Sequence, residues 1–271
     1  MIGKMTTLKT QTNNNEMTFW EHVDVLRKII FRCLFVWLSC SIGAFIFKEE
    51  LFKLLFAPSQ DSFILYKTLC WLSEYFNIKQ ICPDNFEVNF ISTQLASQFM
   101  IHLKVSMCIG AIIALPFLIY QLYCFISPAL YKSEKRYSHV LIFSSVLLFS
   151  LGVVLNYFLI FPLSFRFLGT YQVSELVVNQ ITLNSYISTF LILSLLLGIV
   201  FEIPILAYFM AKLGVIDSLI LKKYRKHAII VICIISAIIT PTADIVTLCL
   251  VSLPIWLLYE ISIYIVKKVA R

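Results

Sequence analysis

The sequence predicts an all-α, polytopic membrane protein in which six transmembrane helices form one bundle. Three observations lead to this prediction. Of the 271 residues, 60% are hydrophobic and only 14% are charged, a composition far from that of soluble domains. Several apolar runs approach the roughly 20 residues that a helix needs to cross about 30 Å of hydrocarbon. The basic residues gather in the segments between these runs.

The apolar runs define the spans and the segments outside them. They cover residues 29–47, 99–126, 140–161, 186–210, 228–240 and 245–266. Because a polar stretch precedes the first run, we predict a retained span there and no cleavable signal sequence. Six crossings place both chain ends on one side. We expect residues 1–16 to form a flexible, polar cytoplasmic tail and residues 17–271 to form a single membrane domain.

The distribution of basic residues predicts the orientation. With the N-terminus inside, fifteen Lys and Arg residues fall in the inner segments and five in the outer ones. The positive-inside rule therefore places both termini in the cytoplasm, together with the loop SPALYKSEKRYSH. The formal net charge of +7 thus reports membrane orientation, and we predict no nucleic-acid partner.

Two features of the spans predict an irregular bundle. The run 228–240 makes a helix about 20 Å long, shorter than the hydrocarbon thickness. Either the bilayer thins around it, or the flanking Lys226 and His227 complete an ordinary span. Prolines lie inside three spans, at Pro116, Pro204 and Pro254. Each predicts a kink, and kinked helices favour a cupped wall over a straight bundle.

The long outer segment, residues 48–98, has two open interpretations. Its pieces LFKLLF and FILYKTLCWL carry apolar residues on a helical face. They either lie flat on the membrane or pack as a cap on neighbouring spans. Of the eight cysteines, six lie inside apolar runs, whereas Cys70 and Cys82 share this outer segment. A disulfide between them is expected if the segment faces an oxidising compartment.

The sequence offers no pattern for catalysis or for metal binding. There is no CxxC pair and no HExxH motif, and the four histidines are scattered singly. We therefore predict that the protein is not an enzyme and needs no cofactor or metal.

Glu202 is the most unusual residue of the spans. It lies deep in the fourth apolar run, in GIVFEIPIL, where a charged side chain costs about 2.5–3.5 kcal/mol on insertion scales. Two interpretations are open: a carboxylate that faces a polar cavity or a partner, or a protonated or paired structural group. One alternative function follows, an ion-coupled secondary transporter that uses Glu202. Such transporters usually consist of two related halves, and we find no internal repeat.

Charged residues at the inner side form two further groups. Asp24 and Arg27 are three residues apart before the first span, on one face of an expected helix, which is typical of a solvated helix start. Glu134 is an isolated acid within the basic loop that follows the second span.

Several motifs taken together resemble the TatC family, the signal-receptor subunit of the twin-arginine protein translocase. In chain order they are HVDVLRK, ALPFLIYQ followed by SPALYKSEKR, FEIP, and TPTAD followed by SLPIWLLYE. The resemblance implies a cup-shaped protein of the bacterial inner membrane. It further implies that the protein binds twin-arginine signal peptides and that transport is driven by the proton-motive force. The implied partners are single-span TatA and TatB subunits and further copies of the same chain, in a receptor complex within the bilayer.

The resemblance also implies a recognition surface for the twin arginines. Glu134 falls on the family's loop glutamate, with Arg136 in the same loop, and Arg27 matches the family arginine. A carboxylate accepts the planar donor fork of a guanidinium in pairs, which selects arginine over lysine. The family's second acid falls on Val25, so we expect Asp24, one residue earlier, to replace it or Glu134 to carry more of the recognition alone.

Partner docking is the last implication of the resemblance. Glu202 matches an intramembrane glutamate on the concave face that contacts polar groups of the partner subunits. The last two spans are implied as a docking region, with Asp244, Thr247 and Leu248 as its candidate residues. Here TPTAD replaces the family pattern TPPD, so Asp244 is displaced by one position.

Overall fold

The computed structural model is almost entirely helical. It describes residues 19–76, 90–126, 138–171, 174, 180–240 and 244–269. The helices are α1 (Phe19–Ile46), α2 (Lys48–Phe56), the 3-10 turn η1 (Ala57–Ser59), α3 (Ile64–Phe76), α4 (Ser97–Ile126), α5 (Ser138–Leu155), the π-helical turn η4 (Asn156–Ile160), α6 (Phe161–Thr170), α7 (Leu183–Val200), α8 (Ile203–Lys212), α9 (Ser218–Lys223), α10 (Arg225–Ile239) and α11 (Ile245–Val269). Within these ranges, β structure is limited to an isolated bridge between Ile91 and Thr182.

Five segments of the described chain are long and apolar enough to cross a membrane. They are Val23–Ile46, Ser97–Phe125, Val140–Thr170, Leu183–Lys212 and Ile245–Val269, with mean hydropathy from 1.9 to 2.6. The remaining predicted span corresponds to α10, whose 15 residues make a helix of about 22 Å. The prediction of an all-helical, multi-pass membrane protein is therefore confirmed, and α10 is as short as its sequence indicated.

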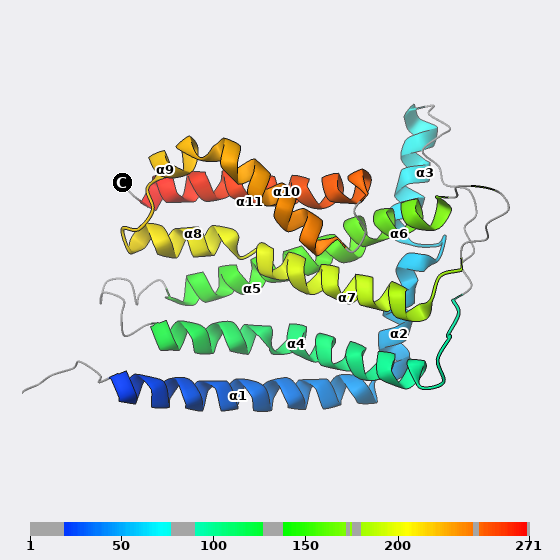
Figure 1. Cartoon of the computed structure of the whole chain (residues 1–271), viewed down its shortest axis with the longest axis horizontal. Helices are drawn as coiled ribbons and strands as arrows, with labels where there is room; N and C mark the ends of the chain where they lie inside the picture. Colours follow the sequence, from blue (N-terminus) through cyan, green and yellow to red (C-terminus); the bar gives the residue numbers. More distant parts are fainter. Residues whose placement is uncertain are drawn as a thin grey trace, which may run out of the picture.

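The long helices run along one axis, and shorter helices close one end of the bundle (Figure 1). α1 begins and α11 ends at the same end, whereas α2 and α3 lie across the opposite end. Of the two interpretations of the outer segment, the structure agrees with a cap, in which α2 packs on the neighbouring spans. Tyr157 and Tyr186 donate hydrogen bonds to the carbonyls of Leu54 and Leu55, at 3.0 and 2.8 Å, in the last turn of α2. Both carbonyls belong to the last turn of α2, where helical hydrogen bonding runs out, and that of Leu54 also accepts from the N–H of Ala57.

The hydrophobic core lies toward the capped end. It includes Leu55 of α2, Val105 of α4, Phe161 of α6 and Leu191 of α7, each at most 1% exposed. Two cavities, described below, lie between the helices toward the end where α1 begins and α11 ends. The bundle is therefore closed by packing at one end and hollow toward the other, which determines where a ligand or partner has room.

The first two spans are joined by a close crossing of α1 and α4. Small residues recur every four positions on α4, at Ser106, Gly110 and Ala114. A Cβ atom added at Gly110 would lie 2.7 Å from Cα of Ser41 on α1. Beside it, the Trp37 indole donates to the Met107 carbonyl at 3.0 Å. Small residues at this spacing are typical of membrane helices whose backbones touch.

Candidate functional site

Glu202 lies at a break between two helices. α7 ends at Val200 and α8 begins at Ile203, with Pro204 in the first turn of α8. Because proline has no N–H, the carbonyl of Val200 loses its usual helical partner, and the chain turns at Phe201 and Glu202. Pro116 and Pro254, in contrast, lie inside the continuous helices α4 and α11. The break therefore singles out the residue that the sequence analysis placed deepest in the membrane.

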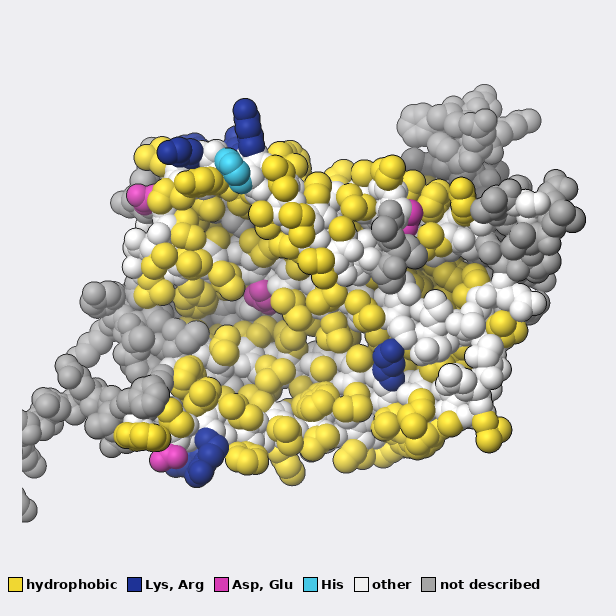
Figure 2. Space-filling view, viewed as in Figure 1, with side chains coloured by type: hydrophobic (Ala, Val, Ile, Leu, Met, Phe, Trp, Pro, Cys, Tyr) yellow, Lys and Arg dark blue, Asp and Glu magenta, His cyan; other side chains and the backbone are white. Residues whose placement is uncertain are grey.

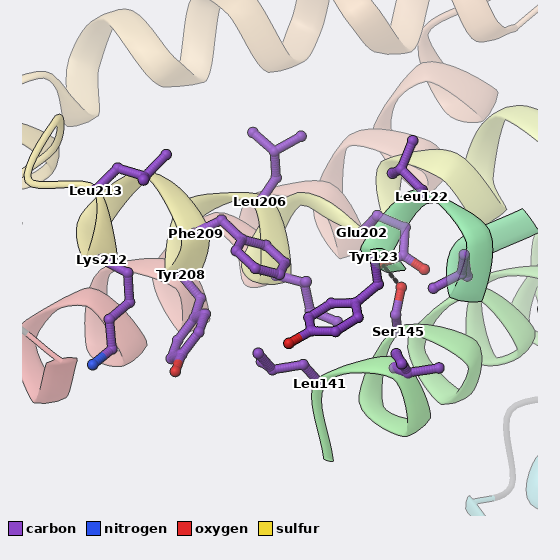
Figure 3. A pocket seen from close by; sticks show the side chains of 13 residues that line it. Leu122, Tyr123, Leu141, Ser145, Glu202, Leu206, Tyr208, Phe209, Lys212 and Leu213 are labelled. Carbon is purple, nitrogen blue, oxygen red and sulfur yellow. Dashed lines mark hydrogen bonds between the residues drawn. The ribbon is translucent and has the colours of Figure 1, made fainter. Parts of the chain in front are cut away.

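Two glycines bring α5 close enough to meet this carboxyl group. A Cβ atom added at Gly152 would lie 3.1 Å from Cα of Gly198, so α5 and α7 touch through their backbones here. Ser145 is two turns from Gly152 along α5, and Glu202 is four residues beyond Gly198. At this separation the Ser145 hydroxyl donates a hydrogen bond of 2.6 Å to Glu202 Oε2 (Figure 3).

A cavity of about 380 Å³ opens beside Glu202. Its walls come from α4, α5 and α8, and most of the lining side chains are apolar, among them Leu122, Leu141 and Phe209. Glu202 and Lys212 occupy opposite ends of the lining (Figure 3). The face of the protein is largely apolar, with isolated charged side chains within it (Figure 2).

A second cavity lies on the side of α4 that faces the first span. It has a volume of about 530 Å³, lies between α1 and α4, and shares Ile119 and Leu122 with the first cavity. Its lining is apolar and includes Leu26, Trp37 and Leu115. Two neighbouring apolar cavities thus flank α4, and Glu202 lies in the wall of the one beside α8.

Two polar atoms at the cavity have no hydrogen-bond partner among the described residues. They are the second carboxyl oxygen of Glu202, Oε1, and the hydroxyl of Tyr123. A buried polar group without a partner costs about 1–3 kcal/mol. The arrangement can therefore accept a hydrogen bond from a group that enters the cavity, which favours the cavity interpretation of Glu202 over that of a fully paired structural group.

The charged pair before the first span is formed as predicted. Arg27 and Asp24 lie on one face of α1 with 4.0 Å between Nη2 and Oδ1, and both side chains are about two-thirds exposed, at 69% and 66%. Val25, at the position of the family acid, is half-buried. Asp24 thus presents its carboxylate to solvent, whereas the next residue packs inward.

Several predicted residues lie outside the described residues. Glu134 and Arg136, both assigned to signal-peptide binding, fall within residues 127–137. Cys82 also lies outside, whereas Cys70 is disulfide-bonded. The pairing of these two cysteines and the positions of the loop residues stay predictions.

The predicted docking residues of the last span build the start of α11. The backbone N–H of Thr247 donates to Asp244 Oδ2 at 2.8 Å, and its hydroxyl donates to Oδ1 at 2.5 Å. Such contacts satisfy donors that the first turn of a helix leaves unpaired. Thr247 is only 2% exposed, whereas Asp244 and Leu248 are both half-buried, so a partner can reach these two residues more easily than Thr247. Their role in docking stays a prediction.

Sequence reasoning missed Ser145 as the hydrogen-bond partner of Glu202, and Tyr123 and Lys212 as further polar residues of the same cavity. Serine and tyrosine are common in membrane helices, and nothing in a single sequence pairs them with a distant glutamate. The available signal was indirect, since Gly152 and Gly198 interrupt two apolar runs and small residues mark close helix contacts. In the part of the chain that the structure describes, no cluster of potential metal ligands was found.

Together, the fold and the cavity define a multi-pass, all-helical membrane protein with a carboxyl group facing an apolar hollow. The family model described as Sec-independent protein translocase protein (TatC) matches residues 21–254. The chain therefore belongs to the TatC family. Members of this family are components of a protein translocase and not enzymes, in agreement with the sequence prediction.

Named relatives and solved structures agree with this membership. The TatC protein of Blattabacterium sp. is 34% identical over 96% of this chain and 99% of its own length. The TatC protein of Aquifex aeolicus is 35% identical over 94% of this chain and 97% of its own length. A crystal structure described as the twin arginine translocase receptor TatC superposes with a TM-score of 0.72 at 34% identity, and covers 93% of this chain and all of that one.

Proposed function

We propose that this protein is the receptor and core scaffold of a twin-arginine translocase in a bacterial inner membrane, with both termini in the cytoplasm. In this role it binds twin-arginine signal peptides and helps to export folded proteins. Three findings support the proposal: membership of the TatC family, the likeness to a structure described as a twin arginine translocase receptor, and the two chain ends at one end of the bundle. None of them favours the alternative of an ion-coupled transporter.

The observation that carries the proposal is the exposed carboxylate of Asp24. Its pairing with Arg27 is loose, at 4.0 Å, and the pair is largely exposed, so it stabilises the protein little. An arriving guanidinium can therefore replace Arg27 at low cost. The second acid of the proposed surface is Glu134, with Arg136 in the same loop.

The apolar segment of the signal peptide is proposed to bind in the cavity between α1 and α4. Its lining residues Leu26 and Ile30 lie within two turns of Asp24 along α1. At about 100° per residue, Asp24 is about 160° from Leu26 around the helix, so the peptide has to pass around the start of α1 between the carboxylate and the cavity. Burial of its apolar segment is favourable by about 25 cal/mol per Å² of apolar surface. Charge recognition and apolar burial thus act at the same level of the bundle, on different sides of α1.

Glu202 supplies the proposed contact with single-span partner subunits of the TatA and TatB type. Its Oε1 atom has no hydrogen-bond partner in the described chain, and the cavity beside it accommodates a polar side chain of a neighbouring helix. A donor such as an amide or hydroxyl group completes the hydrogen bonding. Asp244, Thr247 and Leu248 are the proposed second docking region. The complex is also proposed to contain several copies of this chain.

Photo-crosslinking of a twin-arginine precursor in membrane vesicles tests the recognition step. We expect Asp24→Asn and Glu134→Gln each to reduce crosslinking to this chain, because each removes a charge that a guanidinium requires. Asp217→Asn is the matched control, since Asp217 is an exposed carboxylate outside the proposed surface. Unchanged crosslinking in both recognition variants would overturn the receptor assignment.

Copurification of the partner subunits tests the Glu202 contact. We expect Glu202→Leu to reduce the amount of single-span subunit that accompanies the protein, while Glu50→Gln, at an exposed acid of α2 outside the proposed docking region, leaves it unchanged. No variant of the last span serves as the control, because that span is part of the proposed docking region. Equal recovery from both variants would argue against a role of Glu202 in docking.

A further inference from the structure

Lys104 is a basic residue inside a membrane span that the proposed function does not use. It lies in α4, seven residues after Ser97, which is about 10 Å along the helix from its start. Its side chain is exposed. Ionisable residues within spans are rare and usually have a functional partner.

Lys104 has neutral contacts only among the described residues. Its ammonium Nζ donates to the hydroxyl of Ser188 on α7 at 2.7 Å. The Ser188 hydroxyl in turn donates to Oδ1 of Asn184, one helical turn earlier, at 3.3 Å. The ion pairs of the described chain involve other residues, so none of the described carboxylates neutralises Lys104. Two ammonium N–H groups and the Asn184 amide group remain suited to an anion.

The position of Lys104, Ser188 and Asn184 along the bundle axis indicates which class of anion they bind. α4 and α7 are joined just before their first turns, where Ile91 and Thr182 form a bridge with N–O distances of 3.2 and 3.0 Å between Ile91 and residues 181 and 183. Asn184 belongs to the first turn of α7. The cluster therefore lies within about 10 Å of the starts of α4 and α7, from where the long side chain of a lysine can extend toward the phosphates of lipid headgroups.

The surrounding surface is suited to acyl chains. On α4, Met107, about one turn beyond Lys104 toward the middle of the span, is 37% exposed, and on α7, Ile192, one turn beyond Ser188, is 42% exposed. A phosphate at Lys104 would place the chains of a lipid over these side chains.

We propose that Lys104, positioned by Ser188 and Asn184, binds the phosphate of a phospholipid at the end of the bundle opposite to the chain termini. The site is separate from Glu202, which lies fourteen residues beyond Ser188, or about 21 Å along α7 and α8. It does not depend on signal-peptide binding. Occupancy of the site supplies a negative charge that none of the described residues places beside Lys104.

Native mass spectrometry of the full chain in detergent, titrated with phosphatidylglycerol, tests the proposal. We expect Lys104→Gln and Lys104→Met to weaken the tightest phosphatidylglycerol binding by about tenfold, the loss expected for one hydrogen bond to a charged group. Lys104→Arg should retain binding. Lys53→Gln is the matched control, because Lys53 is an exposed lysine of α2 at the same end of the bundle.

Two results would overturn the proposal. One is equal phosphatidylglycerol affinity for Lys104→Gln and the wild type. The other is an equal loss in Lys53→Gln, which would indicate unspecific attraction between lipid and basic residues. If lipid affinity is unchanged but the Lys104 variants lose single-span subunits on purification, the anion is a partner carboxylate. Melting temperatures in lipid-free detergent check that each variant is folded.

Discussion

The crossing of α1 and α4 at Gly110 gives a prediction whose magnitude follows from the structure. In Gly110→Ala, the new Cβ atom would lie 2.7 Å from both Cα and N of Ser41, whereas ordinary contacts lie at 3.4–4 Å. These neighbours are backbone atoms and cannot rotate away. The two helices must therefore separate by about 1 Å, a gap that forfeits a quarter to a half of the dispersion energy of the atoms concerned.

Gly43→Ala on α1 is the matched control, because no heavy atom lies within 4 Å of the Cβ atom it would add. Replacing glycine by alanine inside a helix stabilises it by up to about 1 kcal/mol. Overpacking in a close contact costs about 1–3 kcal/mol. Because the gain in helix propensity is common to both variants, it cancels in the comparison, and we expect Gly110→Ala to be less stable than Gly43→Ala by about 1–3 kcal/mol in the free energy of unfolding.

Thermal unfolding of the two variants in the same detergent measures this difference. Gly110→Ala should melt below the wild type, and Gly43→Ala at or above it. If Gly110→Ala melts together with Gly43→Ala, the backbones of α1 and α4 are not in contact at Ser41, and the described packing of the first two spans is wrong.

Three further predictions concern the cap and the last spans. Tyr186→Phe should lower the free energy of unfolding by about 1–3 kcal/mol, because it leaves the buried Leu55 carbonyl without its donor; an unchanged melting temperature would contradict this. Arg225→Gln should lower the free energy of unfolding by about 1 kcal/mol at most, since the ion pair of Arg225 with Glu260, at 2.6 Å, is partly exposed. In the double variant, Glu260→Gln should lower the free energy of unfolding by less than it does in the wild type, because the ion pair is already lost. Burial raises the pKa of Tyr66 from 10.0 to about 12, despite the lowering effect of Arg166. The folded state then retains a proton that the unfolded state loses above pH 10, so the stability from Tyr66 should decline between pH 10 and 12. The difference between the melting temperatures of the wild type and Tyr66→Phe should accordingly become smaller from pH 9 to pH 11. A difference that does not change with pH would contradict the raised pKa of Tyr66.

The outline of the bundle could be predicted from the sequence because lipid imposes a simple rule on every span. Apolar length located the long helices, and the short run 228–240 correctly indicated a short helix at α10. Pro204 correctly indicated an interruption of the fourth run, because a missing backbone N–H acts locally. Asp24 and Arg27 were placed on one face by their spacing alone.

Contacts between distant helices could not be predicted in the same way. The hydrogen bond of Ser145 to Glu202 depends on the approach of α5 and α7 at Gly152 and Gly198, and apolar periodicity contains no information on which helices meet. The choice between a cap and a surface helix for residues 48–98 was open for the same reason. It depends on tyrosine hydroxyls of other helices that reach the end of α2.

Recognition of paired arginines by carboxylates at the inner end of the bundle is the central claim of this account. The most direct measurement is the dissociation constant of a twin-arginine signal peptide, and of the same peptide with two lysines, for the full chain in nanodiscs. We predict that the wild type prefers arginine by about tenfold or more, and that a protein with both Asp24→Asn and Glu134→Gln loses this preference. An undiminished preference for arginine in the double variant would contradict the claim.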